Sequence, residues 1–331
     1  MPLDPTLIAC IALALAYAFM NGYNDSGAII APMVASRAIE RRPALILAAV
    51  TEFIGPFLFG TAVAATVATG VVRVEQFTLN DLLAALISAV AWRFVADWLR
   101  VPTSASHALV GGLVGAAIIG HGLSALNFGG IARIFLFLLI APLMGLLLGY
   151  LALNLILNLA RGASPRVNQH FRYGEILCTL LLALSHGAND GQKSIGIFTL
   201  ALVISGTLTS FQVSLGVVAA CAGALALGVA FGSQRIMWRV GEHLYRIRPV
   251  HGFAATGASF ATLLTATLAG APVSGVQILS GTLAGAGAAQ RVSMVRWAIF
   301  QSMAAAWLVT GPATTILAAA LAVGMRLLQA A

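Results

Sequence analysis

Long apolar runs follow one another along almost the whole chain, and they constrain its fold more than any other feature. A helix needs roughly 20 apolar residues to span the hydrocarbon core of a bilayer, which is about 30 Å thick. Hydrophobic residues make up 60% of the chain and charged residues only 8%, whereas charged residues are about a quarter of a typical soluble domain. The sequence therefore predicts an all-α polytopic membrane protein surrounded by the lipid bilayer.

The apolar runs fall into two sets of about five predicted crossings, one in each half of the chain. The first set covers 5–36, interrupted at Asn21 to Asp25, and then 43–66, 79–98, 102–120 and 131–159. The second set covers 175–204, interrupted at His186 to Lys193, and then 212–232, 252–270, 272–290 and 297–325. The expected domains are a first transmembrane repeat over 1–159, a linker over 160–174 and a second, inverted repeat over 175–331.

Matching motifs recur in the two halves. The segment Gly22-Tyr23-Asn24-Asp25 returns 165 residues later as Gly187-Ala188-Asn189-Asp190. The segment 102–107, Pro-Thr-Ser-Ala-Ser-His, returns 170 residues later as Pro-Val-Ser-Gly-Val-Gln at 272–277, and Pro142 returns as Pro312 at the same offset. Inverted repeats with interrupted helices and re-entrant hairpin-like segments are typical of secondary transporters, whose site lies at the repeat interface.

The arginines predict the orientation, because short cytoplasmic loops collect Lys and Arg. Fourteen of them fall on one predicted face and three on the other, which makes the linker cytoplasmic and places both termini outside the cell inner membrane. No basic residue precedes Arg37, so the first span is expected to be retained rather than cleaved as a signal peptide. The fourteen are Arg37, Arg41, Arg42, Arg93, Arg100, Arg161, Arg166, Arg172, Arg235, Arg239, Arg246, Arg248, Arg291 and Arg296, and the three are Arg73, Arg133 and Arg326.

Several other functions find no support in the sequence. The formal net charge of +8 comes from arginines in short loops, without a basic helix, so no nucleic-acid partner is expected. Cys10, Cys178 and Cys221 lie in apolar stretches without metal-ligand spacing and are predicted to be packing residues. No nucleotide-binding motif or nucleophile elbow is present, so neither an enzyme nor a cofactor is predicted. Transport would then use a sodium ion, a proton or the substrate's own gradient.

The two polar islands are the predicted transport site. An ionisable residue at membrane depth costs roughly 2.5 to 3.5 kcal/mol on the mildest scale, and Asp190 lies three residues from Lys193, the only lysine. Asn24, Asp25, Asn189 and Asp190 supply the oxygens that a coupling cation prefers, with Asp25 and Asp190 as possible sodium ligands. A proton on the aspartates and a buried Asp190–Lys193 ion pair are the alternatives.

Donors for an anion are predicted at the two Pro-x-Ser segments. There a proline and a serine are typical of a helix start, and a helix N-terminus in a membrane cavity favours an anion. Simple helix caps are the alternative. The predicted substrate-binding residues are Ser104, Ser106, Ser274, Lys193 and Gln277.

Three further residues are candidates for a proton relay. Glu52 lies in the middle of a predicted span, and His107 and His186 lie within the motifs. A lone histidine is more often a hydrogen-bonded core residue, so that alternative stays open for both histidines.

The motifs together resemble the inorganic phosphate transporter family, abbreviated PiT. The resemblance covers nearly the whole chain and is carried by Asn24-Asp25, the segments 102–107 and 186–193, and the segment 248–253, Arg-Pro-Val-His-Gly-Phe. It implies symport of inorganic phosphate with sodium ions or protons by two inverted repeats. The implied site residues are Asn24, Asp25, Asn189, Asp190, Ser104 and Ser106.

The sequence also departs from the family pattern. The second hairpin of the family usually has Pro-Val-Ser-Thr-Thr-His, whereas this chain has Gly275, Val276 and Gln277 at the last three positions. Thr256 stands where many members carry an acidic residue. The family also contains sulfate permeases, so sulfate is an alternative substrate, and an uncoupled channel-like protein is an alternative class. A homo-oligomer is also possible.

Overall fold

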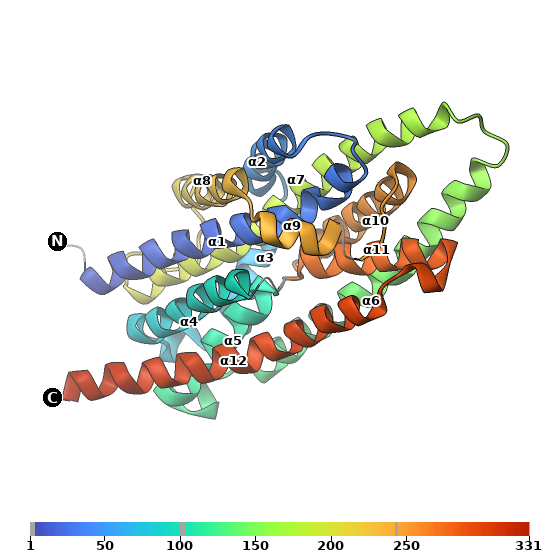
Figure 1. Cartoon of the computed structure of the whole chain (residues 1–331). Coiled ribbons are helices and arrows are strands. Elements are labelled where there is room, and N and C mark those ends of the chain that lie inside the picture. The colour runs from blue at the N-terminus through green and yellow to red at the C-terminus, as the bar shows by residue number, and fades with distance from the viewer. Residues whose placement is uncertain (1–3, 100–102, 242–243, 331) are drawn as a thin grey trace.

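The computed structural model describes residues 4–99, 103–241 and 244–330, which form α-helices and three short 3-10 helices but no extended strand (Figure 1). This confirms the predicted all-α fold. The α-helices of the first half are α1 Pro5–Ala35, α2 Arg41–Leu58, α3 Ala62–Gly70, α4 Leu79–Trp98, α5 Ala105–His121 and α6 Phe128–Leu159. Those of the second half are α7 Val167–Ile204, α8 Leu215–Phe231, α9 Gln234–Gly241, α10 Pro249–Leu268, α11 Gly275–Gln290 and α12 Trp297–Ala330.

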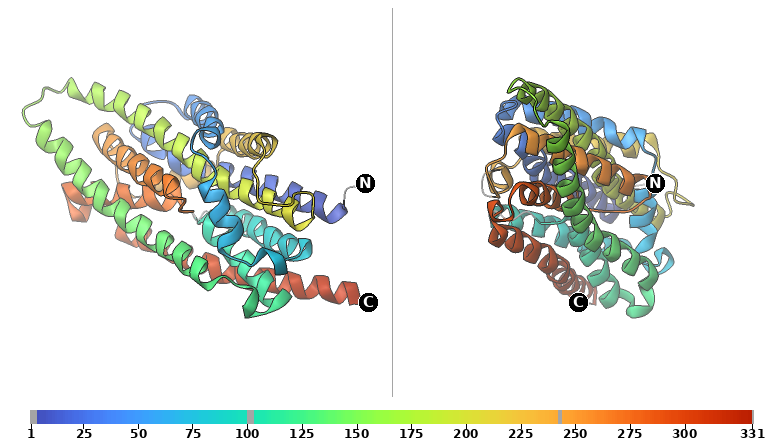
Figure 2. Two further views of the ribbon diagram at one scale, coloured as in Figure 1. Left: turned by 180° about the vertical axis from the view of Figure 1, so that it is seen from behind. Right: turned by 90° about the vertical axis from the view of Figure 1, so that its right-hand side faces the viewer.

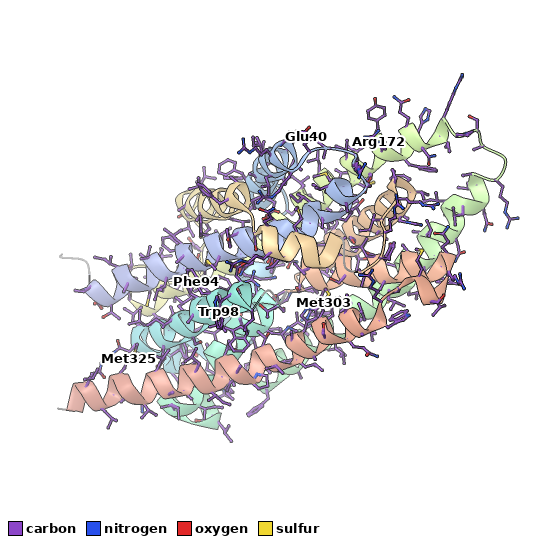
Figure 3. All side chains as sticks on the ribbon, viewed as in Figure 1. Glu40, Phe94, Trp98, Arg172, Met303 and Met325 are labelled. Atoms are coloured by element: carbon purple, nitrogen blue, oxygen red, sulfur yellow. The ribbon has the colours of Figure 1, made fainter. Side chains whose placement is uncertain are left out.

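Four long helices, α1, α6, α7 and α12, run along the long axis of the molecule, and both termini lie at the same end (Figures 1 and 2). The shortest, α1, has 31 residues and is therefore about 46 Å long. Helices α1, α4, α6 and α12 are long and apolar enough to cross a membrane, and the bent pair α2–α3 is a fifth candidate among the described residues. Exposed apolar side chains such as Phe94 and Trp98 cover their outer surfaces (Figure 3). The fold is that of a multi-pass membrane protein.

Two helical hairpins fill the space between the long helices. Hairpin 1 consists of α4 and α5, hairpin 2 consists of α10 and α11, and they lie toward opposite ends of the long axis (Figures 1 and 2). Their tips meet, because the Ser106 hydroxyl of hairpin 1 donates a 3.1 Å hydrogen bond to the Val273 carbonyl of hairpin 2. The predicted surface loop around Arg93 and Arg100 is therefore wrong for Arg93, which is completely buried, while Arg100 lies outside the described residues.

The predicted interruptions at residues 21–25 and 186–193 are also wrong, because α1 and α7 continue through both islands. The glycines there allow close helix contact rather than unwinding. A Cβ atom on Gly22 would lie 2.1 Å from the Leu225 carbonyl oxygen of α8, and one on Gly187 would lie 2.2 Å from the Glu52 carbonyl oxygen of α2. The helices stay intact because the polar side chains find partners in neighbouring helices, as described below.

The actual break lies elsewhere. The predicted single span 43–66 divides into α2 and α3, which are bent by 77°. Gly60 between them has a φ of +69°, a conformation that glycine adopts at little cost and that commonly ends an α-helix.

We predict that Gly187→Ala destabilises the protein by about 1 to 3 kcal/mol, because the added methyl group meets backbone atoms that cannot yield easily. Gly223→Ala in α8 is the matched control, since a Cβ there meets no atom within 4 Å and alanine favours a helix over glycine by about 1 kcal/mol. Thermal unfolding of the purified protein in detergent measures both. Equal unfolding temperatures for the two variants would contradict the close-contact explanation.

Candidate functional site

Six ionisable side chains gather in the interior, where the two hairpin tips approach α1, α2 and α7. Each is at most 3% exposed. Removing an ion from water costs several kcal/mol, which only close partners can offset. The members of this charged cluster are Asp25 of α1, Glu52 of α2, Arg93 of α4, and His186, Asp190 and Lys193 of α7.

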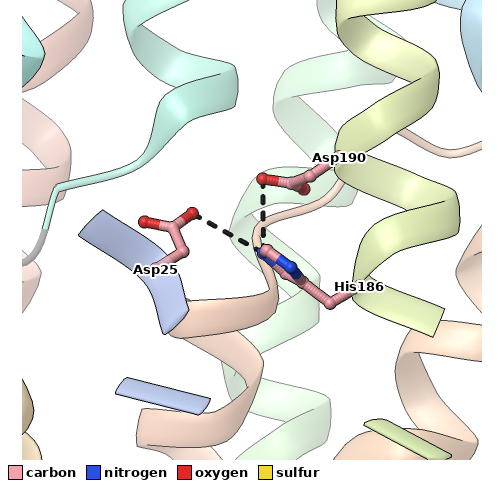
Figure 4. A group of neighbouring side chains, drawn as sticks. All are labelled: Asp25, His186 and Asp190. Atoms are coloured by element: carbon pink, nitrogen blue, oxygen red, sulfur yellow. Dashed lines mark ion pairs between the residues drawn. The ribbon is translucent and has the colours of Figure 1, made fainter. Parts of the chain in front are cut away.

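The charged cluster is a chain of alternating partners. Arg93 pairs with Asp25 at 2.5 Å, and Lys193 pairs with Asp190 at 2.5 Å. The imidazole of His186 lies between the two aspartates, with Nε2 3.7 Å from Asp25 Oδ2 and 3.4 Å from Asp190 Oδ2 (Figure 4). The cluster thus connects hairpin 1, through α1, to α7.

The second nitrogen of the imidazole extends the cluster to α2. His186 Nδ1 lies 2.9 Å from Glu52 Oε2, and the other oxygen of this carboxylate, Oε1, is buried without a partner among the residues that the structure describes. Counted at their formal charges, the three carboxylates, Arg93 and Lys193 sum to −1 when His186 is neutral and to zero when it is protonated. One added proton on His186 would therefore bring the formal charge of the cluster to zero.

Three of these side chains have the geometry of a cation site. One ligand atom each from Asp25, His186 and Asp190 lie within 4.8 Å of one another, and all three residues are buried. Carboxylate oxygens suit hard cations such as sodium. Asp190 Oδ2 has no hydrogen-bond partner among the described residues. A cation or a proton could occupy the same place.

The two asparagines attach their helices to the hairpins. The Asn24 amide donates to the Arg93 carbonyl at 3.2 Å, and the Asn189 amide donates to the Ala271 carbonyl and to Thr267 Oγ1, both at 3.0 Å. Because the NH₂ groups are used as donors, the Oδ1 atoms remain free, and both are buried with no partner in the described parts of the chain. These oxygens, predicted as cation ligands, are therefore available for that role.

The predicted serine donors lie at the hairpin tips. Ser104 caps α5 by accepting a hydrogen bond from the His107 amide at 3.3 Å, as the motif predicted. Ser106 shares the Val273 carbonyl with Lys193, whose ammonium donates to it at 2.5 Å. Ser274 precedes α11 and is 3% exposed. The tips thus bring hydroxyl groups and one ammonium group together.

The departure from the family pattern at Gly275 makes room for the cluster. A Cβ atom at Gly275 would lie only 2.7 Å from Cδ2 of His186, so the imidazole occupies the space that a larger residue would need. Thr256, the other departure, uses its hydroxyl within its own helix, donating to the Gly252 carbonyl at 2.8 Å.

His107 and Gln277 do not join the charged cluster. Both line a cavity of about 570 Å³ between α6 and α12, together with Pro142 and Pro312. Apolar side chains form most of its wall. Among the described residues, no hydrogen bond or ion pair connects either side chain to the charged cluster.

Arg93 is the site residue that sequence reasoning missed. It was assigned to a surface loop, although it lies inside the apolar run 79–98. An arginine inside a predicted span is as costly as Lys193, so its position within the run 79–98 is the sequence feature that indicates a buried site residue.

Comparison with known proteins agrees with the motifs. A sequence model of the phosphate transporter family matches residues 21–163 and 158–318. A probable low-affinity inorganic phosphate transporter of Bacillus subtilis is 35% identical over 318 residues, covering 94% of this chain and 95% of that protein. Proteins of the same description from Rhizobium meliloti and Mycobacterium bovis are 36% and 37% identical, covering 95% and 92% of this chain and 95% and 74% of their own lengths.

A solved structure described as the sodium-dependent phosphate transporter shares the fold. Its TM-score is 0.91 at 23% identity, and the match covers 98% of this chain and 100% of that chain. The long apolar helices, the family model and the relatives together define a multi-pass membrane transporter rather than an enzyme. Since the family model and the relatives cover nearly the whole sequence, the chain belongs to the phosphate transporter family.

We predict that Lys193→Ala destabilises the protein by about 3 to 5 kcal/mol, because it leaves Asp190 as an uncompensated buried charge. Lys193→Arg keeps the charge and should cost less. Adding Asp190→Asn to Lys193→Ala should recover most of the stability, and a double-mutant cycle of unfolding temperatures measures this coupling. Simple addition of the two single losses would show that the pair does not act as a unit.

Proposed function

We propose that the chain is a secondary active transporter that moves inorganic phosphate across the cell inner membrane by symport with a cation, either sodium or a proton. The observation that carries this proposal is the charged cluster, which both halves of the chain build where the two hairpin tips meet. Such a position is typical of substrate sites in transporters.

The proposed architecture is two inverted repeats, 1–159 and 175–331, joined by the linker 160–174. Corresponding helices of the two halves have similar lengths, with 31 and 38 residues in α1 and α7, 20 in both α4 and α10, and 32 and 34 in α6 and α12. Hairpins 1 and 2 lie toward opposite ends of the molecule (Figure 2). Movement of the hairpins against the long helices would expose the site alternately to each side.

The anion would bind at the hairpin tips. Lys193, Ser104, Ser106 and Ser274 supply donors there, and the N-terminus of α5 adds its free amide groups. Phosphate at neutral pH carries a proton, so it also needs an acceptor, which sulfate does not. Asp190, whose Oδ2 atom has no hydrogen-bond partner among the described residues, can accept, and this favours phosphate. The proposed anion site does not include His107 and Gln277, because both line the cavity between α6 and α12.

The coupling cation would bind at the aspartates. Sodium would use Asp25 and Asp190 together with the free oxygens of Asn24 and Asn189. A proton would use His186 and Glu52, which are in direct contact. The description of the related structure names sodium, which supports the first possibility, whereas the charge balance of the cluster supports the second.

Uptake by purified protein in proteoliposomes tests the function. Labelled phosphate should accumulate under an imposed sodium or proton gradient, and the gradient that drives uptake identifies the cation. Sulfate in hundredfold excess should compete poorly, because a site built for a substrate hydrogen discriminates by roughly 10⁴-fold or more. Competition by sulfate at equal concentration would make the chain a sulfate permease, and phosphate flux without accumulation would make it a channel.

We predict that Asp25→Asn and Asp190→Asn each abolish gradient-driven uptake while folded protein remains in the membrane, because each removes a carboxylate that the cation needs. The stable double variant Lys193→Ala with Asp190→Asn should also fail to transport. Wild-type uptake in either single variant would refute the assigned role, and uptake by the double variant would show that Lys193 serves only as an ion-pair partner.

The orientation is part of the proposal, with both termini outside and the linker in the cytoplasm. A cysteine at Arg166 in the linker should be labelled by an impermeant reagent only from the cytoplasm, and one at Ser124 only from outside. Ser124 is exposed, so a cysteine there is accessible to the reagent. Labelling of both positions from one side would refute this topology.

A further inference from the structure

The two aspartates of the charged cluster hold their cations in different ways. Lys193 and Asp190 lie three residues apart on α7, so their pair moves as one body. Arg93 belongs to hairpin 1, whereas Asp25 belongs to α1. A movement of hairpin 1 relative to α1 would therefore separate Arg93 from Asp25 and leave the other pair intact.

We propose that Arg93 is a phosphate-binding residue, and that Asp25 competes with phosphate for its guanidinium group. This inference rests on the phosphate transport proposed above. It assigns to Asp25 a second task besides cation binding: holding Arg93 until the anion displaces it.

The guanidinium group of Arg93 has unused hydrogen-bond donors. Of its five N–H bonds, one at Nη2 donates to Asp25 and one at Nη1 donates to the Thr103 carbonyl at 3.1 Å. The Nε–H is buried and has no partner among the described residues, and the whole residue is 0% exposed. A planar guanidinium with unused donors matches the oxygens of a phosphate group, which it can bind through two parallel hydrogen bonds.

The position of Arg93 places these donors where the anion is expected. Its contact residue Thr103 lies at the tip of hairpin 1, directly before Ser104, which caps α5. The Thr103 hydroxyl is a second buried group, and it too has no partner within the part of the chain that the structure describes. The guanidinium and the hydroxyl therefore adjoin the α5 N-terminus and the serine donors proposed for phosphate.

Displacement of Asp25 would couple the anion to the cation. The charged cluster already sums to −1 with neutral His186, so a buried phosphate adds negative charge that must be balanced. Once phosphate has taken Arg93, the imidazole of His186 remains beside Asp25 in the cluster. The free carboxylate is then available to the coupling cation, so that phosphate binding completes the cation site.

A structural ion pair would behave differently. If Arg93 and Asp25 only stabilise the fold, each single substitution leaves one buried charge unpaired and impairs the protein, and the double substitution removes the problem. If Arg93 binds phosphate, the two single substitutions have opposite effects on affinity. The sign of the Asp25→Asn effect therefore separates the two explanations.

Equilibrium binding of labelled inorganic phosphate to purified full-length protein in nanodiscs measures this. Arg93→Gln should weaken binding by about 10- to 100-fold, the usual effect of losing charge-assisted hydrogen bonds. Asp25→Asn should tighten binding by about threefold or more, because the competitor is gone, although its uptake is lost. The double variant should bind as weakly as Arg93→Gln. Arg235→Gln is the matched control, since Arg235 pairs at 3.5 Å with Asp97 and is half exposed, and should bind like the wild type.

Wild-type affinity in Arg93→Gln, or weaker binding in Asp25→Asn together with wild-type affinity in the double variant, would overturn the assignment. If Arg93→Gln does not fold, the double variant, which buries no unpaired charge from this pair, decides alone. Arg93→Lys supplements it, because lysine keeps the charge without the planar fork and should still bind more weakly than wild type. Absence of phosphate binding in the wild type would instead refute the proposed function itself.

Discussion

Burial of charge in an apolar bundle is the constraint on which the rest of this structure depends. Three carboxylates, one guanidinium, one ammonium and one imidazole are buried. A charged group in such a position needs a partner within a few ångströms to offset the cost of burial. Because these side chains come from α1, α2, α4 and α7, the pairing requirement fixes how those helices sit against one another. The glycines at 22 and 187 support the same arrangement by allowing the backbones of α1 and α7 to approach α8 and α2 closely.

The hairpins place the cluster at the middle of the molecule. Hairpin 1 brings Arg93 to Asp25, and hairpin 2 receives the ammonium of Lys193 through the Val273 carbonyl. Hairpin 1 thus supplies one cation of the cluster, and hairpin 2 accepts a hydrogen bond from the other. An ion pair and the Asn24 amide join α1 to hairpin 1, whereas hydrogen bonds from Lys193 and Asn189 join α7 to hairpin 2.

Much of the site could be predicted from the sequence, because isolated polar residues in apolar runs are conspicuous. Asp25, Glu52, His186, Asp190 and Lys193 were all found in this way, and the structure brings their side chains together. The repeat offsets and the motifs also predicted the family, which the comparisons confirm.

The rest depended on contacts between distant parts of the chain. The tip contact joins residues 167 positions apart, and no local pattern reveals it. The arginine distribution assigned Arg93 to a cytoplasmic loop at the end of the predicted crossing 79–98. Its ion pair with Asp25, which lies 68 residues away in the sequence, was therefore not predicted. Gly22 and Gly187 lie in or beside the predicted interruptions, but their neighbours in α8 and α2, which the sequence alone does not reveal, explain them as positions of close helix packing.

A structure of the purified protein in nanodiscs with bound phosphate tests the central claim most directly. We predict phosphate at the junction of the hairpin tips, with the guanidinium of Arg93 and the ammonium of Lys193 within hydrogen-bonding distance of its oxygens and Asp25 separated from Arg93. Phosphate bound elsewhere, for example in the cavity beside His107 and Gln277, with both ion pairs of the cluster unchanged, would contradict the account.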